Sequence, residues 1–198
     1  MQEPWLIAGL GNPGEQYSRT RHNVGRMLVE TVCARLGTPL RKVRLLPVMA
    51  ADARAGSLEL LLAVPTTFMN VSGPPIASLA RRRGIPLERV IVCHDDLDLP
   101  FGALRVKRGG STAGHHGLES LVQAFRSADF NRVRIGVGRP AGRSQNVGFL
   151  LGPFSKAERE EIEETVGVAA DAALSLPVDG LTLTQSRYNR AGARSSQT

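Results

Sequence analysis

Short apolar runs alternate along the chain with segments in which apolar residues recur every three or four positions. Runs of strand length lie at residues 5–10, 58–64, 90–93, 104–107 and 132–137. The last of these alternates between polar and apolar side chains, which is typical of a half-buried strand, whereas the continuous runs are typical of buried strands. The pattern therefore predicts five strands.

Helical spacing appears between these runs. Apolar residues cover one face of residues 24–36, and Gly37 with Pro39 marks the end of that helix. We expect further helices at about 76–83, from the glycine-rich loop at 109–117 to about 125, and from 155 to about 174. The last begins SKAERE, a good capping sequence with an acidic first turn. Strands alternating with helices predict an α/β fold.

The expected architecture is a single domain over residues 1–190, built as a mixed, twisted β-sheet flanked by helices. Its 198 residues fall within the size of one globular domain, and no internal repeat or linker divides them. The small, polar residues 191–198 are expected to form a flexible C-terminal tail.

Charge and composition narrow the class of protein. The chain has 25 Lys plus Arg against 18 Asp plus Glu, a net charge of +7. This excess is compatible with a polyanionic partner such as nucleic acid, although a solvated basic surface would explain it equally well. No stretch approaches the roughly 20 apolar residues of a membrane helix, so we expect a cytosolic protein that does not contact membranes. Cys33 and Cys93 lie in apolar segments and are expected to be reduced core residues.

Three glycines after the first strand imitate a dinucleotide-binding fingerprint. Gly9, Gly11 and Gly14 match GxGxxG. That motif requires a helix that begins within the glycine run and an acidic residue that ends the second strand. Here a polar loop at 15–22 precedes the helix, and the nearby carboxylates lie in the loop and mid-helix. The sequence therefore predicts no nucleotide cofactor.

Polar residues gather in loops at the ends of strands or the starts of helices, where α/β sheets place their active sites. They include Asn12, His22, Asn70, Asp95 and the pair His115 and His116. An imidazole, a carboxylate and amide donors are the groups that a hydrolase with an activated water needs. The chain lacks a GxSxG motif and metal-binding histidine spacing, so neither a serine nucleophile nor a catalytic metal is expected.

Taken singly, each of these residues has a structural alternative. His22 could be a capping or surface histidine, Asp95 could cap a turn, and the two asparagines could bond to backbone within their loops. Only their combination favours catalysis.

Five blocks of sequence carry that combination further. In chain order they are LIAGLGNPGEQYSRTRHNVG, VPTTFMNVSGPP, VCHDDLDLPFGALRVKRGG, FNRVRIGVGRP and VGFLLGPF. Together they closely resemble the bacterial-type peptidyl-tRNA hydrolase family over nearly the whole chain. The resemblance implies an esterase that cleaves peptide, or an N-blocked aminoacyl group, from tRNA. It also implies a monomer without a cofactor, with peptidyl-tRNA as its partner.

The resemblance assigns roles to individual residues. It makes His22 the catalytic base and Asp95 the group that orients it, with Asn12 and Asn70 binding substrate near the ester. It places Tyr17, Asn23 and Met69 on the walls of the cleft. From these roles we expect neutral His22 to take a proton from the attacking water, and an Asn70 donor to face the developing oxyanion.

A second group of residues would hold the tRNA. The resemblance implies that Lys107 and Arg134 bind the 5′ phosphate of the acceptor arm, although both could instead be solvated strand residues. The run at 81–83 could extend the basic surface or simply end a helix. A third basic position of the family has no clear match, because Gln145 and Asn146 stand there with Arg143 close by.

The glycine-rich loop departs from the family. It ends in GHHGL where the family has GHNGL, so His116 replaces an asparagine that helps to place substrate and water. An imidazole can donate one hydrogen bond but cannot present a carbonyl and an amine together. We expect partial substitution, with a possible charge near the ester at acidic pH. Two other functions stay open: a non-catalytic RNA-binding relative and an esterase for small acylated substrates.

Overall fold

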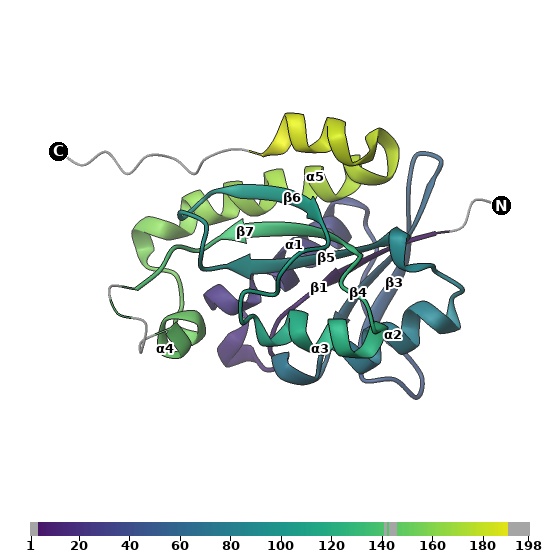
Figure 1. Cartoon of the computed structure of the whole chain (residues 1–198), viewed down its shortest axis with the longest axis horizontal. Helices are drawn as coiled ribbons and strands as arrows, with labels where there is room; N and C mark the ends of the chain where they lie inside the picture. The colour runs from purple at the N-terminus through teal and green to yellow at the C-terminus, as the bar shows by residue number, and fades with distance from the viewer. Residues whose placement is uncertain (1–3, 141, 143–145, 190–198) are drawn as a thin grey trace.

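The fold is built on one mixed β-sheet (Figure 1). The computed structural model describes residues 4–140, 142 and 146–189. Its strands are β1 (Trp5–Gly9), β2 (Arg41–Lys42), β3 (Val48–Ala55), β4 (Leu58–Pro65), β5 (Val90–Asp96), β6 (Leu104–Arg108) and β7 (Asn131–Gly136), in the spatial order β2-β3-β4-β1-β5-β7-β6. The four central strands are parallel, and β3 and β6 run antiparallel to their neighbours β4 and β7. The predicted mixed α/β sheet is confirmed.

Helices cover both faces of the sheet. They are α1 (Val24–Arg35), α2 (Gly73–Arg82), α3 (His116–Phe125), α4 (Asn146–Leu151) and α5 (Lys156–Tyr188), with short 3-10 turns η1 (Glu15–Tyr17), η2 (Arg21–Asn23), η3 (Met69–Val71) and η4 (Leu87–Arg89). One core lies between the sheet and α1 with α5, and a second lies between the sheet and α2 with α3. In β1, Ile7 enters the first core while Leu6 and Ala8 enter the second, so the whole strand is apolar.

Two parts of the fold were not predicted from the pattern. The β2–β3 hairpin at the edge of the sheet has the weakly apolar sequence VMAADARA in its longer strand, and only two of those eight residues are buried. Helix α4 has no buried residue at all. Burial on one face produces the periodicity from which elements are predicted, and neither segment has enough of it.

Helix α5 is longer than expected. It continues beyond residue 174 to Tyr188, but Gly180 leaves helical geometry with φ 76° and ψ 173°. After this break, Gln185 donates to the carbonyl of Val106 at 3.0 Å, and Asn189 accepts from the amide of Val106 at 2.6 Å. The last segment therefore covers the open edge of β6, which would otherwise expose unpaired backbone groups.

By length and composition alone α5 could cross a membrane, with a mean hydropathy of 1.3 in its most apolar window. Core helices of soluble proteins pass the same test. Ile162, Val166 and Ala169 of this helix are buried in the core shared with α1 and the sheet. The expected tail at 191–198 and the positions Arg143 and Gln145 lie outside the described residues.

Candidate active site

A cavity of about 690 Å³ opens at the carboxyl ends of β1, β4 and β5. One wall carries Asn12, His22 and Asp95, and another is formed by α4 through Asn146, Val147, Leu150 and Leu151. The remaining sides come from the loop after β4 and from the glycine-rich loop before α3. The structure thus brings residues from distant parts of the chain into one cleft, as the sequence predicted.

The first wall depends on very close contact between the start of α1 and the sheet. A Cβ built on Gly25 would lie 2.1 Å from the carbonyl oxygen of Cys93, and one built on Gly9 would lie 2.4 Å from the carbonyl oxygen of Gly25. Both distances are far inside van der Waals contact, so only glycine fits at either position. This explains part of the GxGxxG match: Gly9 admits a helix backbone rather than a cofactor.

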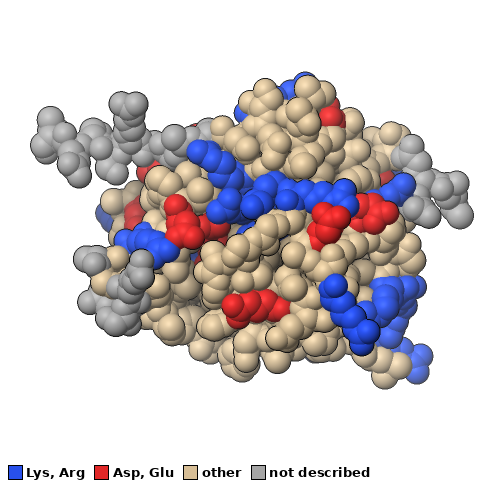
Figure 2. Space-filling model, in the orientation of Figure 1, with Lys and Arg blue, Asp and Glu red and all other residues tan. Residues whose placement is uncertain are grey.

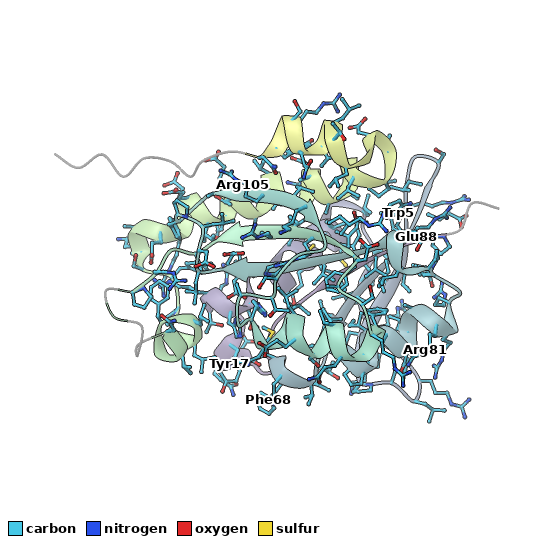
Figure 3. The ribbon with its side chains drawn as sticks, in the orientation of Figure 1. Trp5, Tyr17, Phe68, Arg81, Glu88 and Arg105 are labelled. Atoms are coloured by element: carbon cyan, nitrogen blue, oxygen red, sulfur yellow. The ribbon has the colours of Figure 1, made fainter. Side chains whose placement is uncertain are left out.

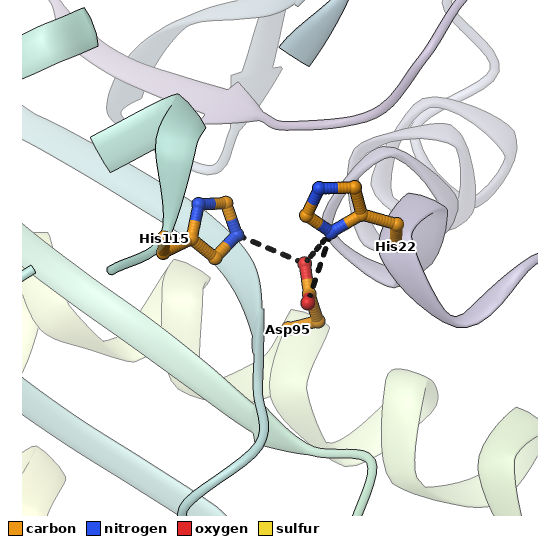
Figure 4. Close-up of side chains that lie close together, drawn as sticks. All are labelled: His22, Asp95 and His115. Atoms are coloured by element: carbon orange, nitrogen blue, oxygen red, sulfur yellow. Dashed lines mark hydrogen bonds and ion pairs between the residues drawn. The ribbon is translucent and has the colours of Figure 1, made fainter. Parts of the chain in front are cut away.

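The close contact places His22, in η2 immediately before α1, over the end of β5. Its Nδ1 lies 2.9 and 3.0 Å from the two carboxylate oxygens of Asp95 (Figure 4). Both residues are buried, with exposed fractions of 8% and 1%. An ionised carboxylate only accepts, so Nδ1 donates and carries the proton of the neutral ring. The lone pair is then on Nε2, which has no hydrogen-bond partner among the described residues and is not enclosed.

His115 approaches Asp95 from the other side, as Figure 4 shows. Its Nε2 lies 2.9 Å from Oδ1 of Asp95, while its Nδ1 accepts from the backbone amides of Gly117 and Leu118 and so caps α3. A nitrogen that accepts two N–H bonds carries no proton, so His115 is neutral and donates through Nε2. Sequence analysis placed His115 among the candidate loop residues without giving it a role. The structure adds that it is a second donor to Asp95.

These three side chains also bring potential metal ligands within 4.8 Å of one another. A metal on Nε2 of His115 would move the ring proton to Nδ1, where it would face two backbone N–H groups. The helix cap therefore opposes metal coordination by His115, and the arrangement is that of a hydrogen-bonded carboxylate.

The protein environment shifts the pKa values of His22 and Asp95 in opposite directions. Burial alone would lower the pKa of His22, but the charge and hydrogen bond of Asp95 outweigh it, and the pKa lies above its ordinary value. Burial would raise the pKa of Asp95, yet His22 and then His115 hold it well below its usual range. Asp95 is therefore ionised whenever His22 titrates.

Asn12 is held in place at both ends. Its backbone amide donates to Oδ1 of Asn23 at 2.8 Å, and its carbonyl accepts from Nδ2 of Asn23 at 2.9 Å. The side-chain Oδ1 of Asn12 accepts from the amide of Met69 at 2.8 Å. This bond fixes the orientation of the side-chain amide. Oδ1 faces Met69, and Nδ2 of Asn12 remains as a donor on the cleft wall.

The structure places two of the expected cleft residues away from the surface of the cavity. Asn23 is fully buried, because both ends of its side chain bind the backbone of Asn12, so it supports the wall without lining it. Tyr17 lies in η1, half-buried, and is not among the residues that line the cavity. Met69 and Asn70 do line it, Met69 buried at 4% exposure and Asn70 exposed.

A band of basic side chains follows β6 and β7 beside the cleft, and Figure 2 shows it as a blue stripe. Leu104, Val106, Val133 and Ile135 of these strands enter the core with α5. Because side chains alternate along a strand, Arg105, Lys107, Arg132 and Arg134 share the other face. We call these four residues the basic band.

Lys107 and Arg134 occupy different environments within the basic band. Lys107 is half-exposed with its ammonium group against Gly110, and burial followed by repulsion from Arg132 and Arg134 lowers its pKa. Arg134 donates from Nε to Asp96 at 2.8 Å. The structure brings both residues onto one surface but not into the cleft itself.

The run at 81–83 does not extend this surface. Figure 3 shows Arg81 at the lower right of the molecule and Arg105 on β6, above the centre and to the left. Arg82 donates to the carbonyl of Arg44, and Arg83 pairs with Asp52. These are contacts of a helix end, the alternative that the sequence also allowed.

His116 stands at the mouth of the cleft. Its side chain is 69% exposed, and its Nδ1 lies 3.3 Å from Glu119, one turn along α3. It lines the cavity, but unlike His115 it makes no contact with Asp95 among the described residues.

Comparison with known proteins places this geometry in a family. A family model described as peptidyl-tRNA hydrolase matches residues 6–197. A relative of that name from Nocardia farcinica is 45% identical over 94% of this chain and 96% of its own, and one from Mycobacterium tuberculosis is 44% identical over 96% and 99%. The crystal structure of peptidyl-tRNA hydrolase from Acinetobacter baumannii superposes with a TM-score of 0.90 at 29% identity, covering 97% of both chains.

Proposed function

The chain belongs to the peptidyl-tRNA hydrolase family, and from that premise we propose that His22, held by Asp95, is the base that activates water in its reaction. The reaction is hydrolysis of the ester bond in peptidyl-tRNA. The observation that carries the proposal is the hydrogen bond from Nδ1 of His22 to the buried Asp95, because it leaves Nε2 as a base facing the cleft.

Nε2 of neutral His22 takes a proton as the water oxygen attacks the ester carbonyl. Asp95 keeps the imidazole in the required tautomer and stabilises the imidazolium that forms. When the tetrahedral intermediate collapses, the ribose oxygen leaves and recovers that proton from His22. The products are a tRNA with a free ribose hydroxyl and the peptide carboxylic acid, which loses its proton to solvent, and the enzyme returns to its starting protonation state.

The developing oxyanion needs donors that are already oriented. Nδ2 of Asn12 meets this requirement, since the bond from Met69 fixes the other end of that amide. Asn70 lies on the same cleft and supplies a second, more exposed donor. His116 at the mouth contributes one hydrogen bond to the substrate in place of the family asparagine.

The basic band holds the acceptor arm of the tRNA. Lys107 and Arg134 bind its 5′ phosphate, which positions the nucleic acid without reading its sequence. This contact suits an enzyme that must accept many tRNAs. The protein acts as a monomer in the cytosol, where translation produces its substrate.

Replacement of the base tests the proposal directly. His22→Ala is expected to lower kcat for N-acetyl-aminoacyl-tRNA by about 10²- to 10⁴-fold, the usual contribution of a general base. The same variant should bind the intact substrate with nearly wild-type affinity, because His22 lies outside the basic band. Near-normal turnover by a folded His22→Ala protein would refute the assignment.

The two other functions are distinguished by the same substrate. A non-catalytic RNA-binding protein would bind it without releasing tRNA, and would have no need for a buried carboxylate that orients a base. An esterase for small acylated substrates would hydrolyse it no faster with a 5′ phosphate than without one. We expect release of tRNA that is faster when the 5′ phosphate is present.

A further inference from the structure

Arg132 is a buried cation that forms no ion pair with any carboxylate of the described chain, although Asp96 is near enough to attract it. It lies on β7 in the middle of the basic band, yet only 3% of it is exposed. Among the described residues no carboxylate lies within ion-pair distance of its guanidinium. Burial, followed by repulsion from Arg134, lowers its pKa to about 10. Burying a charge in this way is costly unless its donors are well satisfied.

Two donor atoms of Arg132, Nη1 and Nε, bind two chain segments that lead to the active site. Nη1 donates to the carbonyls of Gly109 and Ser111, at 3.2 and 2.8 Å, in the glycine-rich loop that leads to His115. Nε lies 3.2 Å from Nε2 of His94, the residue before Asp95. One planar group therefore contacts both chain segments that meet at the catalytic carboxylate.

His94 continues the contact to Asp95. It is 1% exposed, and its Nδ1 lies 2.6 Å from the backbone carbonyl of Asp95. A carbonyl only accepts, so Nδ1 of His94 carries the proton and Nε2 accepts from Arg132. Burial, together with repulsion from the Arg132 guanidinium, keeps the pKa of His94 well below its ordinary value, so the ring is neutral. The ring of His94 also packs edge-on against His115, with centroids 5.1 Å apart.

We propose that Arg132 is a positioning residue for the hydrolytic reaction: by binding His94 and the glycine-rich loop together, it fixes Asp95 and His115 and thereby the orientation of His22. This inference rests on the proposed role of His22. The inference gives the basic band two functions: Lys107 and Arg134 bind phosphate, and Arg132 positions the buried groups of the active site.

The two-sided contact requires arginine. A guanidinium presents several N–H donors in one rigid plane, so it can bind an imidazole through Nε and carbonyls through Nη1 at the same time. A lysine ammonium is a point charge on a flexible stem and would lose the directed bond to His94. Arg132→Lys therefore retains the charge while it removes the positioning.

The first experiment compares conservative variants on one strand. In steady-state hydrolysis of N-acetyl-aminoacyl-tRNA, Arg132→Lys should lower kcat by about 10- to 100-fold, the scale of a misplaced catalytic group, with KM within about two-fold of wild type. Arg134→Lys should instead raise KM and leave kcat nearly unchanged. Arg108→Lys, on the exposed part of β6, is the matched control and should change neither.

Several outcomes would overturn the inference. A folded Arg132→Lys enzyme with kcat within two-fold of wild type would show that the buried contacts do not position the base. A rise in KM like that of Arg134→Lys would make Arg132 a phosphate ligand. Both outcomes leave the role of His22 intact, which only the His22→Ala experiment tests.

A second pair of variants tests the hydrogen bond between Arg132 and His94 by changing His94. His94→Asn keeps a donor where Nδ1 was but removes the acceptor for Arg132, whereas the longer His94→Gln restores an acceptor at the position of Nε2. We expect His94→Asn to lower kcat by as much as Arg132→Lys does, and His94→Gln to lower it less. The double variant Arg132→Lys, His94→Asn should have a kcat no lower than that of either single variant. Equal effects of Asn and Gln, or additive losses in the double variant, would contradict the connection. This pair decides the matter if Arg132→Lys does not fold.

Discussion

At the scale of single residues, hydrogen bonds hold His22 and Asn12, the groups that we propose act on the substrate, and leave one polar atom of each side chain without a partner among the described residues. His22 gives its proton-bearing nitrogen to Asp95, and Asn12 gives its carbonyl oxygen to Met69. What remains on the cleft wall is a lone pair and an N–H donor. Each is held by a partner that is itself buried, so little reorganisation is needed when substrate binds.

Asn12→Asp tests this arrangement at the oxyanion. Aspartate keeps the oxygen that accepts from Met69 but has no N–H to donate, and its charge would repel the oxyanion. We expect kcat to fall by about 10²-fold or more, the usual cost of a lost oxyanion donor, with a smaller change in KM. Single-turnover hydrolysis followed by rapid quenching would measure the rate of the chemical step. Asn70→Asp is the matched comparison, and an equal or larger loss there would assign the main donor to Asn70.

At the scale of elements, the catalytic geometry depends on how closely α1 packs on the sheet. Gly9 and Gly25 allow two backbones to touch, and this contact places η2 over the end of β5. The glycine pattern was visible in the sequence, but its meaning was not, because a fingerprint does not say which group approaches the missing side chain.

Gly25→Ala is expected to damage stability and catalysis together. The new methyl group would meet the carbonyl of Cys93 and force α1 away from β5, at a cost of about 1–3 kcal/mol in the free energy of unfolding. Because His22 lies three residues before Gly25, kcat should fall even at temperatures where the variant is folded. Urea denaturation and kcat should be measured together. Gly148→Ala in α4, where an added Cβ meets nothing, should leave stability unchanged or slightly raised.

At this scale, the apolar pattern of the sequence was sufficient to predict some elements and not others. The central strands and α1 were predicted because burial imposes a strict apolar pattern on them. Asn12, His22 and Asp95 were identified by their loops and by resemblance to the family. Arg132 and His94 were missed as active-site residues, since a basic residue within an alternating strand gives no sign of being buried. Only the register of β5 against β7 brings them together.

At the scale of the whole molecule, the enzyme has two adjoining surfaces with separate tasks. They are the cleft and the basic band beside it (Figure 2). We propose that the cleft performs the chemistry on the ester and that the basic band holds a phosphate of the tRNA. A net charge of +7 alone did not locate this band, because the cluster at 81–83 places three further cations on another part of the surface. The pairing of β6 with β7 determines which cations lie together in the basic band.

Lys107→Gln should weaken binding without harming the chemical step. Removing one phosphate contact is expected to raise KM for N-blocked aminoacyl-tRNA and to reduce the slope of log KM against log salt concentration by about one. Lys42→Gln, an exposed lysine on the opposite edge strand β2, makes the same charge change and should leave the slope as it is. If both variants shift the slope equally, binding depends on net charge rather than on the basic band.

The central claim, that neutral His22 is the base, is tested most directly by following its imidazole by NMR across pH while measuring kcat/KM in the same buffers. Asp95 and the neighbouring His115 face this ring, and the pKa of His22 is raised, so its neutral fraction should grow with pH through a midpoint above the ordinary value of about 6.5. The account predicts that kcat/KM rises along the same curve. A rate profile whose midpoint differs from the titration of His22 would contradict it.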